Sequence, residues 1–78
     1  MKRTLMYARM VRDNLIASGC SLISQNIFGK DLILKFNKGN VSDRTIEDFL
    51  SKINMNYRLE VGKDTFTVLL ISPESHKD

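Results

Sequence analysis

Apolar residues along this chain recur with two different periods. Between Thr4 and Ala17, and again between Val41 and Asn54, they return at steps of three and four, which is typical of one face of an α-helix. On both sides of Gly29-Lys30 and Gly62-Lys63, apolar and polar residues alternate with a period of two, as they do in strands with one buried face. The pattern predicts the order helix, hairpin, helix, hairpin.

The first predicted helix, Thr4–Ala17, has a single apolar stripe. Thr4 is a suitable N-cap, and Ser18-Gly19 is a suitable stop because glycine accepts the left-handed conformation after a helix. At 100° per residue, three cations share one flank of the stripe and two methionines lie on the other side. The stripe is Leu5, Ala8, Val11 and Leu15, the cations are Lys2, Arg9 and Arg12, and the methionines are Met6 and Met10.

The second predicted helix has a stronger start signal. Ser42 can accept the unpaired amide hydrogens of the first turn, and Asp43 favours the positive end of the helix. Val41 and Ile46 have the spacing of a hydrophobic staple. Its apolar face is Ile46, Phe49, Leu50 and Ile53, and we expect it to end near Asn54.

Both hairpins are predicted to have two-residue loops that begin with glycine, as a type II′ turn requires. This assumption gives each hairpin one apolar and one polar face, whereas a slip of one residue would exchange the two faces. The predicted apolar pairs of the first hairpin are Ile27 with Leu32, Gln25 with Leu34, and Ile23 with Phe36. Those of the second are Leu59 with Phe66, Tyr57 with Val68, and Met55 with Leu70.

These elements predict a two-layer α+β fold of the order α-β-β-α-β-β. Two helices cover one face of a four-stranded, mainly antiparallel sheet, and the strand order is not encoded in the pattern. We assign one domain to residues 1–72 and a polar tail to residues 73–78, with the chain loosening from Ser72 onward. The predicted core is Leu5, Val11, Leu15, Ile23, Ile27, Leu32, Leu34, Phe36, Ile46, Phe49, Leu50, Ile53, Tyr57, Leu59, Phe66, Val68 and Leu70.

Composition agrees with one small globular domain. The 78 residues are 42% hydrophobic and 27% charged, and no apolar run approaches the ~20 residues that span a membrane. Cys20 is the only cysteine, so no internal disulfide forms, which fits a reducing compartment and leads us to expect a cytoplasmic protein. We expect Cys20 to be a small buried hydrophobe. A domain this small can also gain core by forming a homodimer.

Catalytic, cofactor and metal signatures are weak. His76 lies in the predicted tail, and Cys20 and Ser42 have no candidate base. The adjacent carboxylates of Glu47 and Asp48 point apart on a helix. The two Gly-Lys-Asp blocks lack the spacing of a phosphate loop, although adjacent turns would present Lys30 and Lys63 together. We therefore expect a non-enzymatic protein with no cofactor and no metal.

The excess positive charge lies in the first helix. Residues 1–19 contain four basic residues and one acidic residue, a net charge of +3, and the rest of the chain is neutral. Lys2, Arg3, Arg9 and Arg12 could contact nucleic-acid phosphates, or they could simply solvate the helix. A membrane-surface role is disfavoured because the apolar stripe is needed for the core.

The outer sheet face offers a second candidate surface. Ile33, Leu69 and Ile71 are predicted to point away from the helices, either as ordinary scatter or as an interface patch. Edge strands can also recruit a partner by strand addition. Our leading hypothesis is a protein-binding or homodimeric module using Ile33, Lys35, Arg58, Thr67, Leu69 and Ile71 or an edge strand. The alternative is a nucleic-acid-binding regulator using Lys2, Arg3, Arg9 and Arg12.

Overall fold

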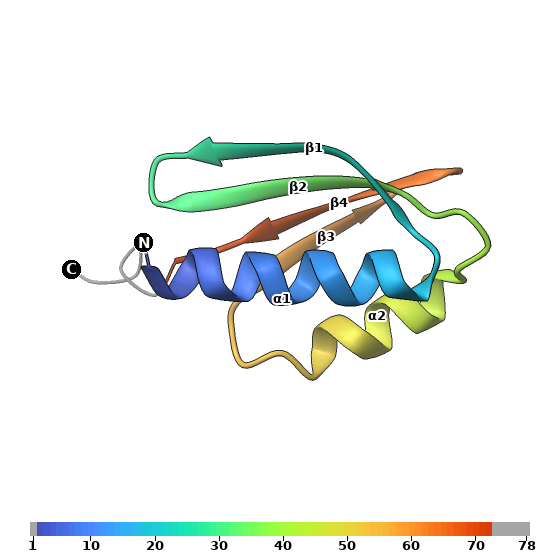
Figure 1. Cartoon of the computed structure of the whole chain (residues 1–78), viewed down its shortest axis with the longest axis horizontal. Coiled ribbons are helices and arrows are strands. Elements are labelled where there is room, and N and C mark those ends of the chain that lie inside the picture. The colour runs from blue at the N-terminus through green and yellow to red at the C-terminus, as the bar shows by residue number, and fades with distance from the viewer. Residues whose placement is uncertain (1, 73–78) are drawn as a thin grey trace.

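The computed structural model describes residues 2–72, with side chains from Leu5 onward, as a four-stranded sheet covered on one face by two helices (Figure 1). The sheet order is β1-β2-β4-β3, and every neighbouring pair is antiparallel. The predicted α+β fold is confirmed, and the strand order is new. The elements are α1 (Lys2–Ser18), β1 (Ser21–Phe28), β2 (Asp31–Asn37), α2 (Asp43–Ser51), β3 (Tyr57–Val61) and β4 (Thr65–Leu70).

The ends of α1 follow from local chemistry. The helix starts two residues earlier and ends one residue later than predicted, and it stops at Gly19, which has a φ of +121°. The Cys20 N–H donates to the Leu15 carbonyl and the Gly19 N–H to the Ile16 carbonyl, both at 3.0 Å. These two bonds form a Schellman motif, which satisfies carbonyls at the helix end and turns the chain into β1.

The start of α2 is also as predicted. The Ser42 side chain accepts a hydrogen bond from the Thr45 N–H at 3.2 Å, and both Val41 and Ile46 pack in the core. The helix ends at Ser51 rather than near Asn54, because the Lys52 and Ile53 amides make shorter-range bonds to the carbonyls of Phe49 and Leu50.

The first hairpin has the predicted turn and most of the predicted register. Gly29 has a φ of +66°, and Ile27 pairs with Leu32 as expected. Further along, the register shifts between Leu22 and Ser24, so that Leu22 rather than Ile23 lies opposite Phe36. The predicted pairing of Ile23 is therefore wrong, because a β-bulge inserts this residue as an extra position.

The second hairpin has the predicted faces but a register shifted by two residues. Leu59 pairs with Val68 rather than Phe66, and Tyr57 pairs with Leu70 rather than Val68. The loop between Val61 and Phe66 is longer than two residues, and Gly62 does not have the positive φ of a type II′ turn. Because side chains alternate with a period of two, a shift of two leaves every side chain on its predicted face.

The core lies between the sheet and the helices and is centred on β2 and β4. The rings of Phe36 and Phe66, which are paired across these strands, stack with centroids 5.1 Å apart. The buried residues are Ala8, Val11, Leu15, Cys20, Leu32, Leu34, Phe36, Ile46, Leu50, Phe66, Val68 and Leu70. The predicted core residues Phe49, Ile53, Tyr57 and Leu59 pack against them, partly buried.

Three predicted core residues are exposed. Leu5 is 44%, Ile23 51% and Ile27 61% accessible to solvent. Ile27 lies on the helix-facing side of β1, yet β1 is the outermost strand and α1 packs against β2 as well as β1. Leu22 of β1 packs against the core, but Ile27 on the same face of this strand remains in contact with solvent.

Two further predictions, on the positions of Lys30 and Lys63 and on the start of the loose tail at Ser72, are wrong. Lys30 and Lys63 lie at opposite ends of the sheet, because β2 and β4 are antiparallel neighbours, so they do not form a joint cationic spot. Ser72 is fully buried, and its N–H donates to Asp31 Oδ1 at 2.8 Å, which attaches it to the fold rather than to a loose tail. The predicted tail, residues 73–78 with His76, lies outside the described residues.

Candidate docking surfaces

The outer sheet face brings together most of the residues predicted for a protein interface. Leu69 lies between Ile33 on β2 and Arg58 on β3, and Thr67 lies between Lys35 and Glu60 in the next row. Ile33, Arg58, Glu60, Thr67 and Leu69 line a hollow of about 180 Å³. The apolar side chains here are half-buried by their neighbours, so this face offers limited apolar area.

Ile71 does not join that hollow. It follows the end of β4, where its N–H donates to the Asn56 carbonyl at 3.0 Å. It lines a separate hollow beside the α2–β3 connection, with Ile53 and Met55. The predicted six-residue interface is therefore divided between two places on the surface.

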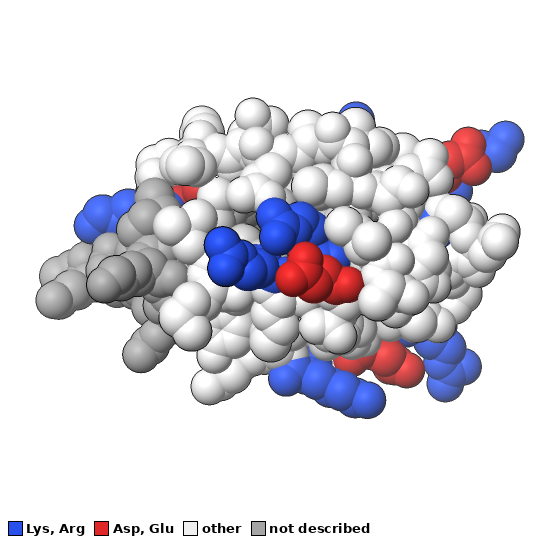
Figure 2. All heavy atoms as spheres, in the orientation of Figure 1, with Lys and Arg blue, Asp and Glu red and all other residues white. Residues whose placement is uncertain are grey.

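The basic residues of α1 are only partly available for phosphates. Arg12 Nε lies 3.2 Å from Asp13 Oδ1, which offsets its charge, whereas Arg9 has no ion-pair partner among the described residues. In Figure 2, cationic and anionic groups lie side by side over α1, surrounded by uncharged side chains. Lys2 and Arg3 lie in the first turn, where only the backbone is described.

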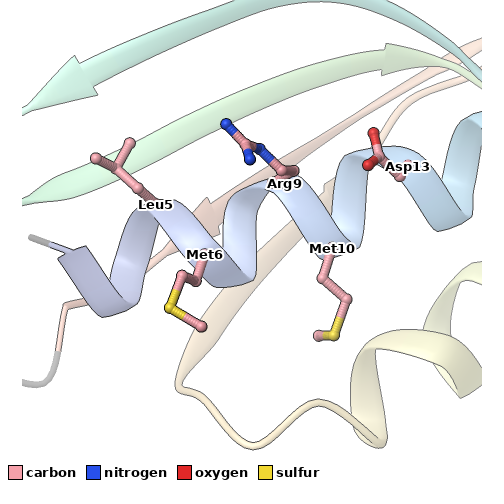
Figure 3. Close-up of a pocket in the computed structure, with 5 residues that line it drawn as sticks. All are labelled: Leu5, Met6, Arg9, Met10 and Asp13. Carbon is pink, nitrogen blue, oxygen red and sulfur yellow. The ribbon is translucent and has the colours of Figure 1, made fainter.

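A pocket of about 490 Å³ lies on α1 and is lined by Leu5, Met6, Arg9, Met10 and Asp13. Figure 3 shows Leu5, Arg9 and Asp13 on the side of the helix toward β1 and β2, and Met6 and Met10 on the opposite side. This confirms the predicted separation of Arg9 from the methionines. Because one helix supplies the whole lining, the pocket is a contact surface rather than an enclosed ligand cavity.

Strand β1 forms one edge of the sheet. Docking at an edge strand was predicted from the sequence, but without indicating which strand is at the edge. β1 is eight residues long, is hydrogen-bonded to β2 alone within the described chain, and contains no charged residue and no proline. Ile23 and Ile27 are exposed, and Phe28, at 70% accessibility, is the most exposed side chain of the three. Long, uncharged, apolar edges are sites where another strand can add.

The backbone of β1 also presents hydrogen-bonding groups to this edge. Phe28 and Asp31 close the two-residue turn, so they form a hydrogen-bonded pair of the ladder. Such pairs alternate with pairs whose N–H and C=O groups face away from the partner strand. Gln25 and Ile27 are therefore the residues whose backbone groups point outward. We define the β1 edge as Ile23, Gln25, Ile27 and Phe28.

The opposite edge of the sheet differs in length and in charge. β3 is five residues long and carries Arg58 and Glu60. Short, charged edges resist the addition of another strand. The uncharged run of β1 was the sequence signal for a docking edge, but only the strand order identifies β1 as an edge.

The remaining candidate chemistry is limited. Among the described residues, no group of three or more His, Cys, Asp or Glu side chains is close enough to hold a metal ion. Neither helix in residues 2–72 has the length and apolar content needed to cross a bilayer. Cys20 is buried, as predicted, and burial raises the pKa of its thiol, which disfavours the reactive thiolate.

The chain was also compared with known proteins. No protein family, curated protein or solved structure matches it.

Proposed function

We propose that this domain is a protein-docking module and that its docking element is the β1 edge. The single observation that carries the proposal is an eight-residue, uncharged edge strand with exposed Ile23, Ile27 and Phe28. A partner strand that paired with Gln25 and Ile27 would satisfy their outward backbone groups and cover the two isoleucines. The free, buried Cys20 supports action in a reducing compartment, which we take to be the cytoplasm.

The β1 edge is favoured over the outer sheet face because its apolar side chains are more exposed. Ile33 and Leu69 are half-buried within the sheet surface, whereas Ile27 is 61% accessible. Main-chain hydrogen bonds contribute affinity in strand addition, and alternate side chains contribute specificity. Only an edge strand offers both.

Amide hydrogen exchange tests the proposal. The probe is a lysine-flanked peptide that carries the sequence of residues 21–28, and the readout is exchange at the Gln25 and Ile27 amides, with and without peptide and across protein concentrations. We expect protection of both amides when the edge is occupied. Ile27→Lys should weaken peptide binding about tenfold, because it places a charge on the edge.

Val61→Lys is the matched control, since Val61 is an exposed apolar residue on the opposite edge of the sheet. It should leave peptide binding unchanged. Exchange of the Gln25 and Ile27 amides at the rate of unprotected amides under every condition would overturn the proposal, as would equal effects of the two substitutions.

A nucleic-acid-binding regulator is the second candidate, favoured by Arg9, which is exposed, has no ion-pair partner among the described residues, and lies on the helix that carries the excess positive charge. Titration of labelled DNA and RNA across a salt series tests it. Arg9→Glu with Arg12→Glu should abolish binding, whereas Arg44→Glu with Lys52→Glu on the other helix should not. The logarithm of affinity should fall with that of salt by about 0.9 per phosphate contacted. Absence of binding at low salt would exclude this candidate.

A further inference from the structure

Resting on the proposed function, we infer that the β1 edge pairs with the β1 edge of a second copy of this chain. The interface is completed by α1, whose Arg9 and Asp13 meet Asp13 and Arg9 of the second copy. A two-fold symmetric interface requires one patch to be complementary to itself. Both parts of this surface meet that requirement.

The first part is the strand. β1 carries no charge, so two copies placed side by side bring no like charges together. An antiparallel pairing centred on Gln25 sets Gln25 of one copy opposite Gln25 of the other, and Ile27 opposite the bulged Ile23. Both isoleucines are more than half exposed in the single chain, and the pairing covers them. The result is one continuous eight-stranded sheet.

The second part is the helix. Arg9 and Asp13 are four residues apart and lie on the same side of α1, toward β1 and β2 (Figure 3). Two antiparallel copies of α1 with their symmetry axis midway between these residues bring each arginine to the aspartate of the other copy. Asp13 already forms an ion pair with Arg12 Nε. Its side chain is nevertheless 62% accessible, and its carboxylate has acceptor positions for a second cation.

The two parts share one symmetry axis. α1 ends and β1 begins at the same end of the sheet, and the two elements run in opposite directions (Figure 1). With rises of about 1.5 Å per helical residue and about 3.3 Å per strand residue, the midpoint of Arg9 and Asp13 lies roughly 10 Å from that end. Because Ile23 is an extra residue, Gln25 lies only three regular strand steps from Ser21, roughly 10 Å from that end. One axis perpendicular to the sheet therefore passes close to both centres.

The distance between the two helices is compatible with this arrangement. α1 packs over β2 and β1, and strands lie about 4.8 Å apart, so the two α1 axes would be roughly 10–14 Å apart. Packed helices are separated by about 8–10 Å, and the additional space accommodates apolar side chains. Leu5, which is 44% accessible, lies on the side of α1 toward β1 and β2 (Figure 3). Ile16, which is 46% accessible, falls on the same flank as Arg9 at 100° per residue. A second copy thus buries the apolar residues that the single chain leaves exposed at this edge.

The inference is tested by exchanging the charges at Arg9 and Asp13 and measuring dimerisation by sedimentation equilibrium, from micromolar to millimolar protein. Wild type should dimerise. Arg9→Asp and Asp13→Arg should each weaken the dimer about tenfold, because each places like charges together twice. The double variant Arg9→Asp with Asp13→Arg should regain wild-type affinity. The equivalent exchange on α2, Asp48→Lys with Lys52→Asp, should have no effect, and circular dichroism verifies that each variant is folded.

Two results would overturn the inference. In the first, the chain is monomeric at every concentration while the peptide still protects Gln25 and Ile27, which would show that the edge accepts an added strand but not the β1 edge of a second folded copy, and would leave the proposed function standing. In the second, a dimer forms but the double variant is no better than the single ones, which would place the dimer contact elsewhere. Failure of the proposed function is separate, because it appears as unprotected edge amides.

Discussion

The ammonium of Lys38 lies 2.7 Å from the carboxylate of Asp43, and this contact joins the end of β2 to the start of α2. The same ammonium donates to the carbonyls of Gly62 at 2.6 Å and Lys63 at 3.2 Å. The Lys38 backbone N–H donates to the Asp64 carbonyl at 2.8 Å. Lys38 thus joins the β3–β4 loop to the end of β2, where Thr65 pairs with Asn37. The register of the second hairpin, to which this loop belongs, is the one that differs by two residues from the prediction.

Removal of this ammonium should destabilise the domain. We expect Lys38→Met to lower the free energy of unfolding by about 1–3 kcal/mol, because three acceptors lose a charged donor that is only 12% accessible. Lys35→Met, at an exposed lysine on β2, should change it by less than about 0.5 kcal/mol. Urea denaturation of both variants measures the difference, and equal losses would contradict a specific role for Lys38.

Gly39 is a position where any side chain should be costly. It has a φ of +60°, and an added Cβ would lie 2.4 Å from the Gly19 carbonyl oxygen. Gly29 has a similar φ of +66° with open space around it. The left-handed conformation alone costs an alanine about 1–2 kcal/mol. We expect Gly39→Ala to lower the free energy of unfolding clearly more than Gly29→Ala, and thermal unfolding of the pair tests this expectation.

Cys20 should make stability decrease at alkaline pH. Burial raises the pKa of its thiol, so the folded state binds this proton more tightly than the unfolded state. Stability is therefore fully present below the pKa of the unfolded thiol, about 8.5, and is lost as pH rises through the folded pKa. The unfolding free energy of wild type should fall faster above this pH than that of Cys20→Ala. Parallel curves for the two proteins would show that the thiol makes no contribution.

The outer sheet face should be dispensable for docking. Ile33→Thr with Leu69→Thr removes apolar area from the outer hollow without adding charge and retains residues that favour strands. We expect peptide binding at the β1 edge to be unchanged, with some loss of stability from the half-buried positions. Fluorescence anisotropy of the labelled peptide measures binding. Loss of binding in this variant, together with retention in Ile27→Lys, would move the docking site to the outer face.

Much of the fold was predictable because local physics sets the period of each element. The Ser42 cap, the Gly19 stop and the positive φ at Gly29 each depend on a few adjacent residues, and all three are confirmed. The faces of the second hairpin were also predicted correctly although its register was wrong by two. An alternating pattern is unchanged by a shift of two, so it cannot distinguish these registers.

The tertiary structure decided which of the predicted apolar faces are covered. Ile27 and Leu34 both lie on the helix-facing side of the sheet, yet Leu34 is fully buried and Ile27 is largely exposed. The difference is that β2 is central and β1 is at the edge, which depends on strand order. The amino-acid sequence by itself therefore determined the order of the elements, the faces of their side chains, and the signals at Ser42 and Gly19, because those depend on neighbours along the chain. The docking edge, the extra residue at Ile23 and the contacts of Lys38 arise from neighbours in space.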